Sequence, residues 1–354
     1  MPRALFSHLP STVVLLSLLG VLLAVGIMLI AGVIFFMARV LLSPPRMDDP
    51  KAAWLLQRLT PGDLKMRFAK KTFEVRDERT GEKLKIAAWW IPHADARGRC
   101  VVLIHGYADA KVGAIAWAPT FHAIGLNILA IDLRAHGESE GPHTTGGFFE
   151  RHDVSQVIDQ LRAERPDETR QLVLFGVSLG AAVAAATVVL RHDSLGTSDI
   201  DAVILECPFA DYRDAIRAHC RVLGMPGDRM VRTGVWLAQK RSGADFGAVR
   251  PVDLIPRIQC PLMVIRSDAD LFITPTDAER VEKAALARRP EIGPTIYWQA
   301  ENAHHVAALY EDPELYRERI ADFLGMLPIA AGVSGDAGAP APGASSPPIP
   351  AQAP

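Results

Sequence analysis

Short apolar runs recur along most of the sequence, separated by longer stretches of mixed character. The runs lie at residues 101–104, 126–131, 172–175, 202–205 and 261–265. Each is short enough for a strand and, apart from Asn127, is apolar throughout, as in strands that are buried on both faces. Between the runs, stretches such as residues 153–161 have the spacing of helices. This alternation predicts an α/β fold with a mostly parallel sheet and helices on both faces.

Three segments depart from this alternation. Residues 73–75 and 84–90 read as two strands of an N-terminal hairpin around a turn at residues 79–82. Residues 51–66 have the pattern of a helix that follows the N-terminal segment. Residues 208–257 contain helical segments, at 212–223 and 230–239, but no apolar strand run. An insertion at that point would lie over the carboxyl ends of the strands, so we interpret it as a helical cap.

The N-terminal segment has the properties of a membrane anchor. Residues 13–38 carry no charged side chain, and as a helix they would be about 39 Å long, enough to cross a hydrocarbon core of about 30 Å. A cleavable signal peptide is the competing interpretation, with a weak cleavage site at residues 24–26. Its apolar core would be shorter than this run, and a buried core helix would not be apolar all round. We therefore expect an uncleaved anchor.

Charge around the anchor does not decide its orientation. Arg3 precedes it, whereas Arg39, Arg46, Lys51 and Arg58 follow it. Basic residues alone slightly favour a cytoplasmic location for the C-terminal side, but the difference is small. We expect a single-pass protein, and the side of the membrane that carries the rest of the chain stays open.

The composition divides the chain into three parts. We expect an anchor and linker at residues 1–45, a folded domain at 46–328 with its cap at about 208–257, and a disordered tail at 329–354 that is rich in Ala, Pro and Gly. The net charge of −2 gives no reason to expect nucleic acid as a partner. The four cysteines show no zinc-ligand spacing, and a disulfide between Cys207 and Cys220 stays open.

One motif indicates nucleophilic chemistry. Gly176, Ser178 and Gly180 form a G-x-S-x-G pattern between the apolar run 172–175 and an alanine-rich stretch at 181–190. This is the strand–turn–helix setting in which a serine hydroxyl stands exposed on a tight turn, with glycines leaving room for the backbone. Such a serine needs a base, and the base needs an orienting carboxylate.

Candidates for both partners follow Ser178 in the chain. Asp268 and Asp270 come directly after the run 261–265, and His304 and His305 lie in the last loop before a C-terminal helix. The order serine, acid, histidine is the one found in proteins that carry this elbow on an α/β sheet.

Residues from about 70 to 325 resemble the α/β-hydrolase superfamily, and within it the membrane-anchored bacterial serine hydrolases of the serine aminopeptidase-like and dienelactone hydrolase-like groups. The motifs that carry the resemblance are the elbow together with residues 105–107, 132–139, 207–209, 268–275 and 304–313. Ala135 is a departure, since relatives often have glycine there. The resemblance implies the α/β-hydrolase fold, with a helical cap, after one transmembrane helix. It also implies the bacterial inner membrane as the location.

The resemblance assigns the triad to Ser178, Asp270 and His305. It prefers Asp270 because the acid precedes a short apolar stretch and then Pro275, and it prefers His305 for its spacing to residues 312–313. The oxyanion hole is expected at the backbone amides of Leu179, which follows the nucleophile, and of Tyr107. His105, His136, Asp153 and Glu206 are interpreted as structural residues. No metal or organic cofactor is implied.

These residues predict a serine hydrolase that cleaves a carboxylester or thioester through an acyl-enzyme intermediate. A peptidase or acyltransferase with the same triad, and a non-catalytic binding protein, are the alternatives. The substrate is expected to be a small-molecule or lipid-like acyl compound, and the oligomeric state is not readable. The cap carries five arginines that either form a solvated face or contact anionic lipid headgroups, namely Arg213, Arg217, Arg221, Arg229 and Arg232.

Overall fold

Eight strands form one sheet in the computed structural model, which describes residues 11–222, 224–225 and 228–328. The order across the sheet is β1-β2-β4-β3-β5-β6-β7-β8. β2 is antiparallel to both of its neighbours, and the strands from β4 to β8 are parallel. The strands are β1 (Ala69–Arg76), β2 (Lys83–Ile91), β3 (Arg99–Ile104), β4 (Asn127–Ile131), β5 (Gln171–Val177), β6 (Ala202–Glu206), β7 (Leu262–Ser267) and β8 (Thr295–Ala300). The predicted mostly parallel sheet with an N-terminal hairpin is confirmed.

Alternate side chains of the central strands pack into two separate cores. In β5, Leu172 and Leu174 belong to one core, whereas Val173 and Phe175 belong to the other. Successive strand residues point to opposite faces, so burial of both faces explains why the run is apolar without alternation. Among the strands of the described part of the chain, β8 pairs only with β7, and its residues are largely half-buried. Its mixed composition gave no apolar run, and the sequence analysis missed it.

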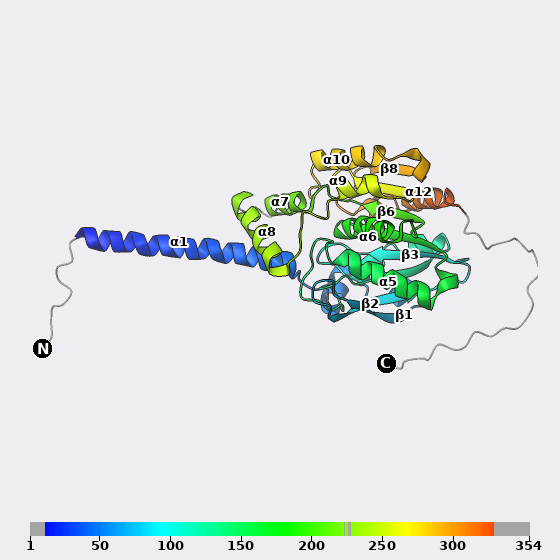
Figure 1. The fold of residues 1–354 in the computed structure, drawn as a ribbon, viewed down its shortest axis with the longest axis horizontal. Coiled ribbons are helices and arrows are strands. Elements are labelled where there is room, and N and C mark those ends of the chain that lie inside the picture. The colour runs from blue at the N-terminus through cyan, green and yellow to red at the C-terminus, as the bar shows by residue number, and fades with distance from the viewer. Residues whose placement is uncertain (1–10, 223, 226–227, 329–354) are drawn as a thin grey trace, which may run out of the picture.

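Helices cover both faces of the sheet (Figure 1). α5 and α6 pack beside each other in one core, and α4 and α12 contribute to the other. The helices are α1 (Ser11–Leu42), α2 (Asp49–Leu56), α3 (Lys111–Ala114), α4 (Ala118–Ala123), α5 (Glu150–Glu164), α6 (Leu179–Leu195), α7 (Tyr212–Val222), α8 (Asp228–Ser242), α9 (Pro251–Leu254), α10 (Pro275–Leu286), α11 (Ala308–Glu311) and α12 (Pro313–Gly325). The helix expected at residues 51–66 ends early, because Gln57 adopts a left-handed conformation; a short 3₁₀ turn, Pro61–Leu64, follows.

α1 extends away from the sheet as one long helix, and α7 and α8 lie beside its C-terminal end (Figure 1). Its length and composition would allow it to cross a membrane. The apolar side chains between residues 13 and 36 are largely exposed, whereas Met37, Ala38 and Leu42 are buried in the core. The helix therefore changes from an exposed apolar rod to a packed core element over its last turns.

The C-terminal carbonyls of α1 are bound by the rest of the protein. The last carbonyls of a helix have no partner inside the helix. Here the Tyr107 hydroxyl donates a hydrogen bond to the Val40 carbonyl, and the Thr144 amide donates to the Leu42 carbonyl over 2.8 Å. The Arg46 guanidinium then donates to the carbonyls of Gly137 and Ser139. These bonds fix the end of α1 to the sheet domain. The predicted boundary at residue 45 did not anticipate this packing, and the predicted tail at 329–354 lies outside the described residues.

Candidate active site

Ser178 occupies a strained turn between β5 and α6. Its φ of 53° and ψ of −113° lie in a backbone region that residues other than glycine rarely adopt. The flanking glycines leave no room for a side chain, since a Cβ on Gly176 would lie 2.2 Å from the Gly180 carbonyl oxygen. A Cβ on Gly180 would lie 2.2 Å from the Ile104 carbonyl oxygen. The G-x-S-x-G pattern is therefore a steric requirement of this turn.

A chain of hydrogen bonds connects Ser178 to His305 and Asp270. His305 Nε2 lies 3.0 Å from Ser178 Oγ, and its Nδ1 lies 2.6 Å from Asp270 Oδ2. The three residues come from loops that follow β5, β7 and β8, at the carboxyl ends of parallel strands. The structure thus brings together the three residues that the resemblance selected.

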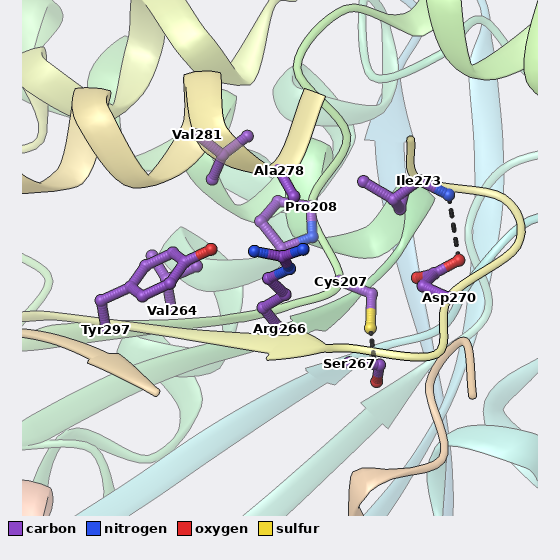
Figure 2. Close-up of a pocket in the computed structure, with 10 residues that line it drawn as sticks. All are labelled: Cys207, Pro208, Val264, Arg266, Ser267, Asp270, Ile273, Ala278, Val281 and Tyr297. Carbon is purple, nitrogen blue, oxygen red and sulfur yellow. Dashed lines mark hydrogen bonds between the residues drawn. The ribbon is translucent and has the colours of Figure 1, made fainter. Parts of the chain in front are cut away.

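Backbone amides of the loop after β7 hold the Asp270 carboxylate in place beside His305. Its Oδ1 accepts hydrogen bonds from the amides of Phe272, at 2.7 Å, and Ile273, at 2.9 Å; Figure 2 shows the second. Burial alone would raise the pKa of Asp270, but the hydrogen bond and charge of His305, with these two amides, lower it overall. An ionised Asp270 favours the tautomer in which His305 Nδ1 donates, which leaves Nε2 free to accept from the Ser178 hydroxyl.

The neighbouring alternatives lie elsewhere. Asp268 is exposed, and the His304 ring contacts the Ala269 carbonyl at 3.2 Å. Within the described residues, no hydrogen bond joins either side chain to Ser178 or His305. His304 and Asp268 therefore offer matched controls for the two residues that do make these contacts.

The two amides expected to form an oxyanion hole border the serine. Leu179 is the first residue of α6, and Tyr107 follows Gly106 in the loop after β3. A Cβ on Gly106 would lie 3.6 Å from Ser178 Cβ, which places this loop against the nucleophile. Across the described residues, neither the Tyr107 nor the Leu179 amide donates to a backbone carbonyl. Two free amides at the end of a strand and the start of a helix can stabilise a developing oxyanion.

Four polar residues near the site have structural partners instead. His105 Nε2 accepts from the Leu133 amide at 2.9 Å, and its Nδ1 contacts the Gly106 carbonyl at 2.7 Å. His136 Nδ1 contacts the Arg134 carbonyl. Asp153 accepts two hydrogen bonds from the Arg134 guanidinium. These contacts hold the loops after β3 and β4.

Glu206 is the fourth of these residues, at the buried end of β6. It accepts hydrogen bonds from Tyr316 Oη at 2.7 Å and Trp117 Nε1 at 3.0 Å. Burial raises the pKa of Glu206 to about 7, although the two hydrogen bonds act in the opposite direction. Its own carbonyl accepts from the Ser178 amide at 2.8 Å, so Glu206 supports the elbow through its backbone.

Cys207, Asp270 and His305 present potential metal-ligand atoms within 4.8 Å of one another. Each of these atoms already has another partner. Cys207 Sγ lies 3.3 Å from Ser267 Oγ (Figure 2). It also accepts a hydrogen bond from the Val306 amide. Burial also raises the pKa of the Cys207 thiol, which disfavours the thiolate that binds metals. The contacts fit a packed thiol better than a ligand. All four cysteines are free, Cys220 among them, so the open disulfide does not form.

Two cavities adjoin the triad and differ in size. The one drawn in Figure 2 is lined by Asp270, Cys207 and Tyr297, among other residues. Its volume of about 10 Å³ holds at most one water molecule. The other, of about 340 Å³, reaches Ser178 and Leu179. Only the second is in the range of small-molecule sites, about 300–1,000 Å³.

Two helices, α7 and α1, contribute much of the largely apolar lining of the larger cavity. Helix α7, in the segment expected to form a cap, contributes Ile216 and His219, and the end of α1 contributes four side chains, namely Phe36, Met37, Val40 and Leu41. The sequence analysis treated α1 only as an anchor and so missed these residues. The uncharged run is longer than a bilayer requires, and this excess length was the signal that could have indicated a second role.

His219 is a further residue that the sequence analysis missed. Its ring stacks on Phe272 with centroids 4.4 Å apart and lies 6.4 Å from the ring of His305. Burial lowers the pKa of His219, and its Nδ1 contacts the Ala215 carbonyl at 2.8 Å. A neutral His219 and Phe272 together enclose one side of the His305 ring. A histidine on an amphipathic cap helix gives no distinctive sequence signal.

Comparison with known proteins places these features in context. Residues 95–244 match the family described as serine aminopeptidase, S33. The uncharacterized protein YqkD of Bacillus subtilis is 25% identical over 225 residues, which cover 63% of this chain and 70% of that protein. The lysophosphatidylserine lipase ABHD12 of Xenopus tropicalis is 24% identical over 239 residues, 64% of this chain and 57% of that protein. Among solved structures, the Pyrococcus furiosus esterase Pf2001 has a TM-score of 0.61 and 23% identity, over 80% of this chain and 99% of that one.

Proposed function

Because the chain belongs to the α/β-hydrolase superfamily, we propose that it is a membrane-anchored serine hydrolase that cleaves a carboxylester or thioester. The observation that carries this proposal is the hydrogen-bond chain from Ser178 through His305 to Asp270. A serine on a strained elbow with this geometry is the arrangement of an activated nucleophile.

In the proposed reaction, Ser178 Oγ attacks the acyl carbonyl while His305 Nε2 takes its proton. Asp270 orients the ring and stabilises the imidazolium that forms. The amides of Tyr107 and Leu179 donate to the oxyanion. His305 then passes its proton to the leaving group, which departs and leaves an acyl-enzyme on Ser178. Water, activated by His305, attacks this ester and releases the acid and the free serine.

The membrane enters the proposal through α1 and the cap. A long apolar helix near the N-terminus supports a single-pass anchor. A signal sequence would have the same properties, and N-terminal sequencing of the mature protein distinguishes a retained helix from a cleaved one. On α8, which packs against α1, Arg229, Arg232 and the exposed Trp236 line one surface hollow. Tryptophan and arginine are suited to the interface between bilayer and water. Among the relatives, the Xenopus tropicalis protein is named a lipase and the Pyrococcus furiosus protein an esterase, which favours an acyl ester substrate.

A peptidase is the second candidate, because the matching family is described as serine aminopeptidase. An acyltransferase would use the same acyl-enzyme with an acceptor other than water. Product analysis separates the three. An ester incubated with competing alcohols and amines would yield free acid from a hydrolase and acyl-transfer products from a transferase, and amino-terminal amides would be cleaved only by a peptidase.

The direct test is hydrolysis of a soluble acetate ester by the full-length protein in detergent, beside Ser178→Ala. We expect turnover by the parent and a loss of about 10⁶-fold in kcat for the variant. Equal turnover by both proteins would contradict the proposal, and so would the absence of turnover on every ester by a folded parent protein.

A further inference from the structure

The end of α1 lies in the wall of the cavity that contains Ser178. Met37 is buried against Gly234 of α8, at which a Cβ would come within 2.4 Å of the Met37 methyl carbon. Val40 and Leu41 line the same cavity, and the Tyr107 hydroxyl is bonded to the Val40 carbonyl. Tyr107 is also the residue whose amide borders the serine. The position of α1 is thus tied directly to the proposed oxyanion loop.

Phe36 lies at the opening of the cavity to the protein surface. Its side chain lines the cavity and is nevertheless 62% exposed. The exposed apolar stretch of α1, residues 13–36, is about 36 Å long at a rise of about 1.5 Å per residue. A hydrocarbon core is about 30 Å thick, so a bilayer that surrounds this stretch ends close to Phe36. Arg39 follows on the exposed surface, as expected at the edge of a bilayer.

From this juxtaposition we propose that the last two turns of α1 form one wall of an acyl-chain site, and that the substrate is a single-chain amphiphile that enters from the bilayer. The inference rests on the proposed hydrolase function, and it adds the substrate class and the residues that select it. The acyl chain lies between Val40 and Leu41 of α1 and Ile216 of α7, and the ester carbonyl reaches Ser178. The polar headgroup stays at the interface.

The size and the apolar lining of the cavity favour a substrate with a single acyl chain. Its volume of about 340 Å³ is at the lower end of the range of small-molecule sites, about 300–1,000 Å³. In the proposed site, this space holds one acyl chain. The lining is apolar except near Ser178 and His219, so a methylene chain gains by leaving water while a charged substrate would lose its hydration.

Val40→Trp tests the wall, and Val33→Trp is its control. The two positions are seven residues apart and share a face of α1, but only Val40 lines the cavity. The assay uses the full-length protein in detergent and a series of p-nitrophenyl esters from acetate to palmitate. We expect Val40→Trp to lower the ratio of kcat/KM for the longest accepted ester to that for acetate by about tenfold or more, since misfit in an apolar pocket has effects of this size. Val33→Trp should leave the ratio as in the parent.

Met37→Ala gives a second test that works in the opposite direction. It enlarges the cavity, and we expect the preferred chain to become longer. Unchanged ratios in both Val40→Trp and Met37→Ala, with active parent protein, would overturn the acyl site while leaving the hydrolase proposal intact. A parent that hydrolyses no ester and is not labelled by a fluorophosphonate would instead overturn the proposed function. The same chain-length shift in Val33→Trp would show an effect of the anchor itself and would also count against the site.

Discussion

The elbow around Ser178 and the wall formed by α1 border the same cavity, yet they are held by different interactions. At the elbow, backbone meets backbone, and a Cβ on Gly180 would come within 2.2 Å of the Ile104 carbonyl oxygen. At the wall, the contacts are between side chains, such as Met37 against α8 and Val40 facing the cavity. Backbone contacts of this kind admit one arrangement only, whereas apolar side-chain packing tolerates changes of size at a moderate cost.

This difference separates chemistry from selectivity. Changes at the elbow and its hydrogen-bonded partners should lower the rate for every ester alike, because they act on the reacting atoms. Changes at the wall should alter which chain length is preferred. If the two regions act independently, one kind of variant changes the rate without the chain-length preference, and the other changes the preference without the rate for acetate.

The largest effect is expected from the histidine pair. His305→Ala removes the base that is hydrogen-bonded to Ser178, so kcat should fall by about 10⁶-fold for short and long esters alike. His304→Ala removes a ring whose Nδ1 contacts the Ala269 carbonyl, and the kcat of this variant should stay near that of the parent. Steady-state kinetics on two ester lengths measures both. Similar losses in the two variants would show that the loop, and not His305 itself, carries the effect.

The acid pair should give the next largest effect. Asp270→Asn keeps the shape of the side chain but no longer favours the His305 tautomer in which Nδ1 donates, so kcat should fall by about 10⁴-fold. The exposed Asp268→Asn is the matched control and should have little effect. The comparison between chemistry and selectivity fails here if Asp270→Asn changes the chain-length preference but not the rate.

A smaller effect, on stability, is expected from the elbow glycine. Gly180→Ala forces the backbone of β3 or α6 to move, and overpacking of this kind lowers the free energy of unfolding by about 1–3 kcal/mol. Gly325→Ala, where nothing lies within 4 Å of the added Cβ, should be neutral or slightly stabilising. Denaturant titration of both variants measures the difference. A Gly180→Ala variant as stable and active as the parent would show that the elbow is less constrained than its geometry indicates.

The last effect is on the pH dependence of stability and concerns Glu206, whose side chain takes no part in the proposed reaction. Its folded pKa of about 7 is above the ordinary value of about 4.3. The folded state therefore binds more protons between these values, and the contribution of Glu206 to the free energy of unfolding falls as the pH rises from about 4.3 to about 7.

Glu206→Gln should remove this dependence. We expect the variant to lose less stability than the parent between about pH 5 and about pH 8, measured by unfolding in detergent. Glu301→Gln, in the exposed turn after β8, is the control and should follow the parent. If the parent and Glu206→Gln show the same pH dependence, the carboxyl group does not titrate in this window.

Most of the sheet could be predicted because its strands are buried on both faces. Burial on both faces requires a continuous apolar run, and such runs are visible in the sequence at β3 to β7. β8 was not predicted, because this edge strand is only half-buried and combines polar with apolar residues. Ala135 is instructive as well: its φ of 60° explains why glycine suits this position.

The site was predictable where local geometry constrains residue type and unpredictable where distant segments meet. The elbow glycines have a steric cause that leaves a local motif. Asp270 and His305 could be chosen over Asp268 and His304 only through the resemblance, since both members of each pair have the right chemistry. For the wall formed by α1, the only signal was the excess length of the uncharged run. Its individual residues could not be identified, because an apolar residue that faces a cavity looks the same in the sequence as one that faces lipid.

In the proposed reaction, Ser178 is a nucleophile that His305 activates. The most direct measurement is labelling of the full-length protein with a fluorophosphonate, followed by mass spectrometry of its peptides. We expect one adduct, on Ser178, that is absent in Ser178→Ala and forms far more slowly in His305→Ala than in His304→Ala. An adduct on another residue, or no adduct on a folded protein, would contradict it.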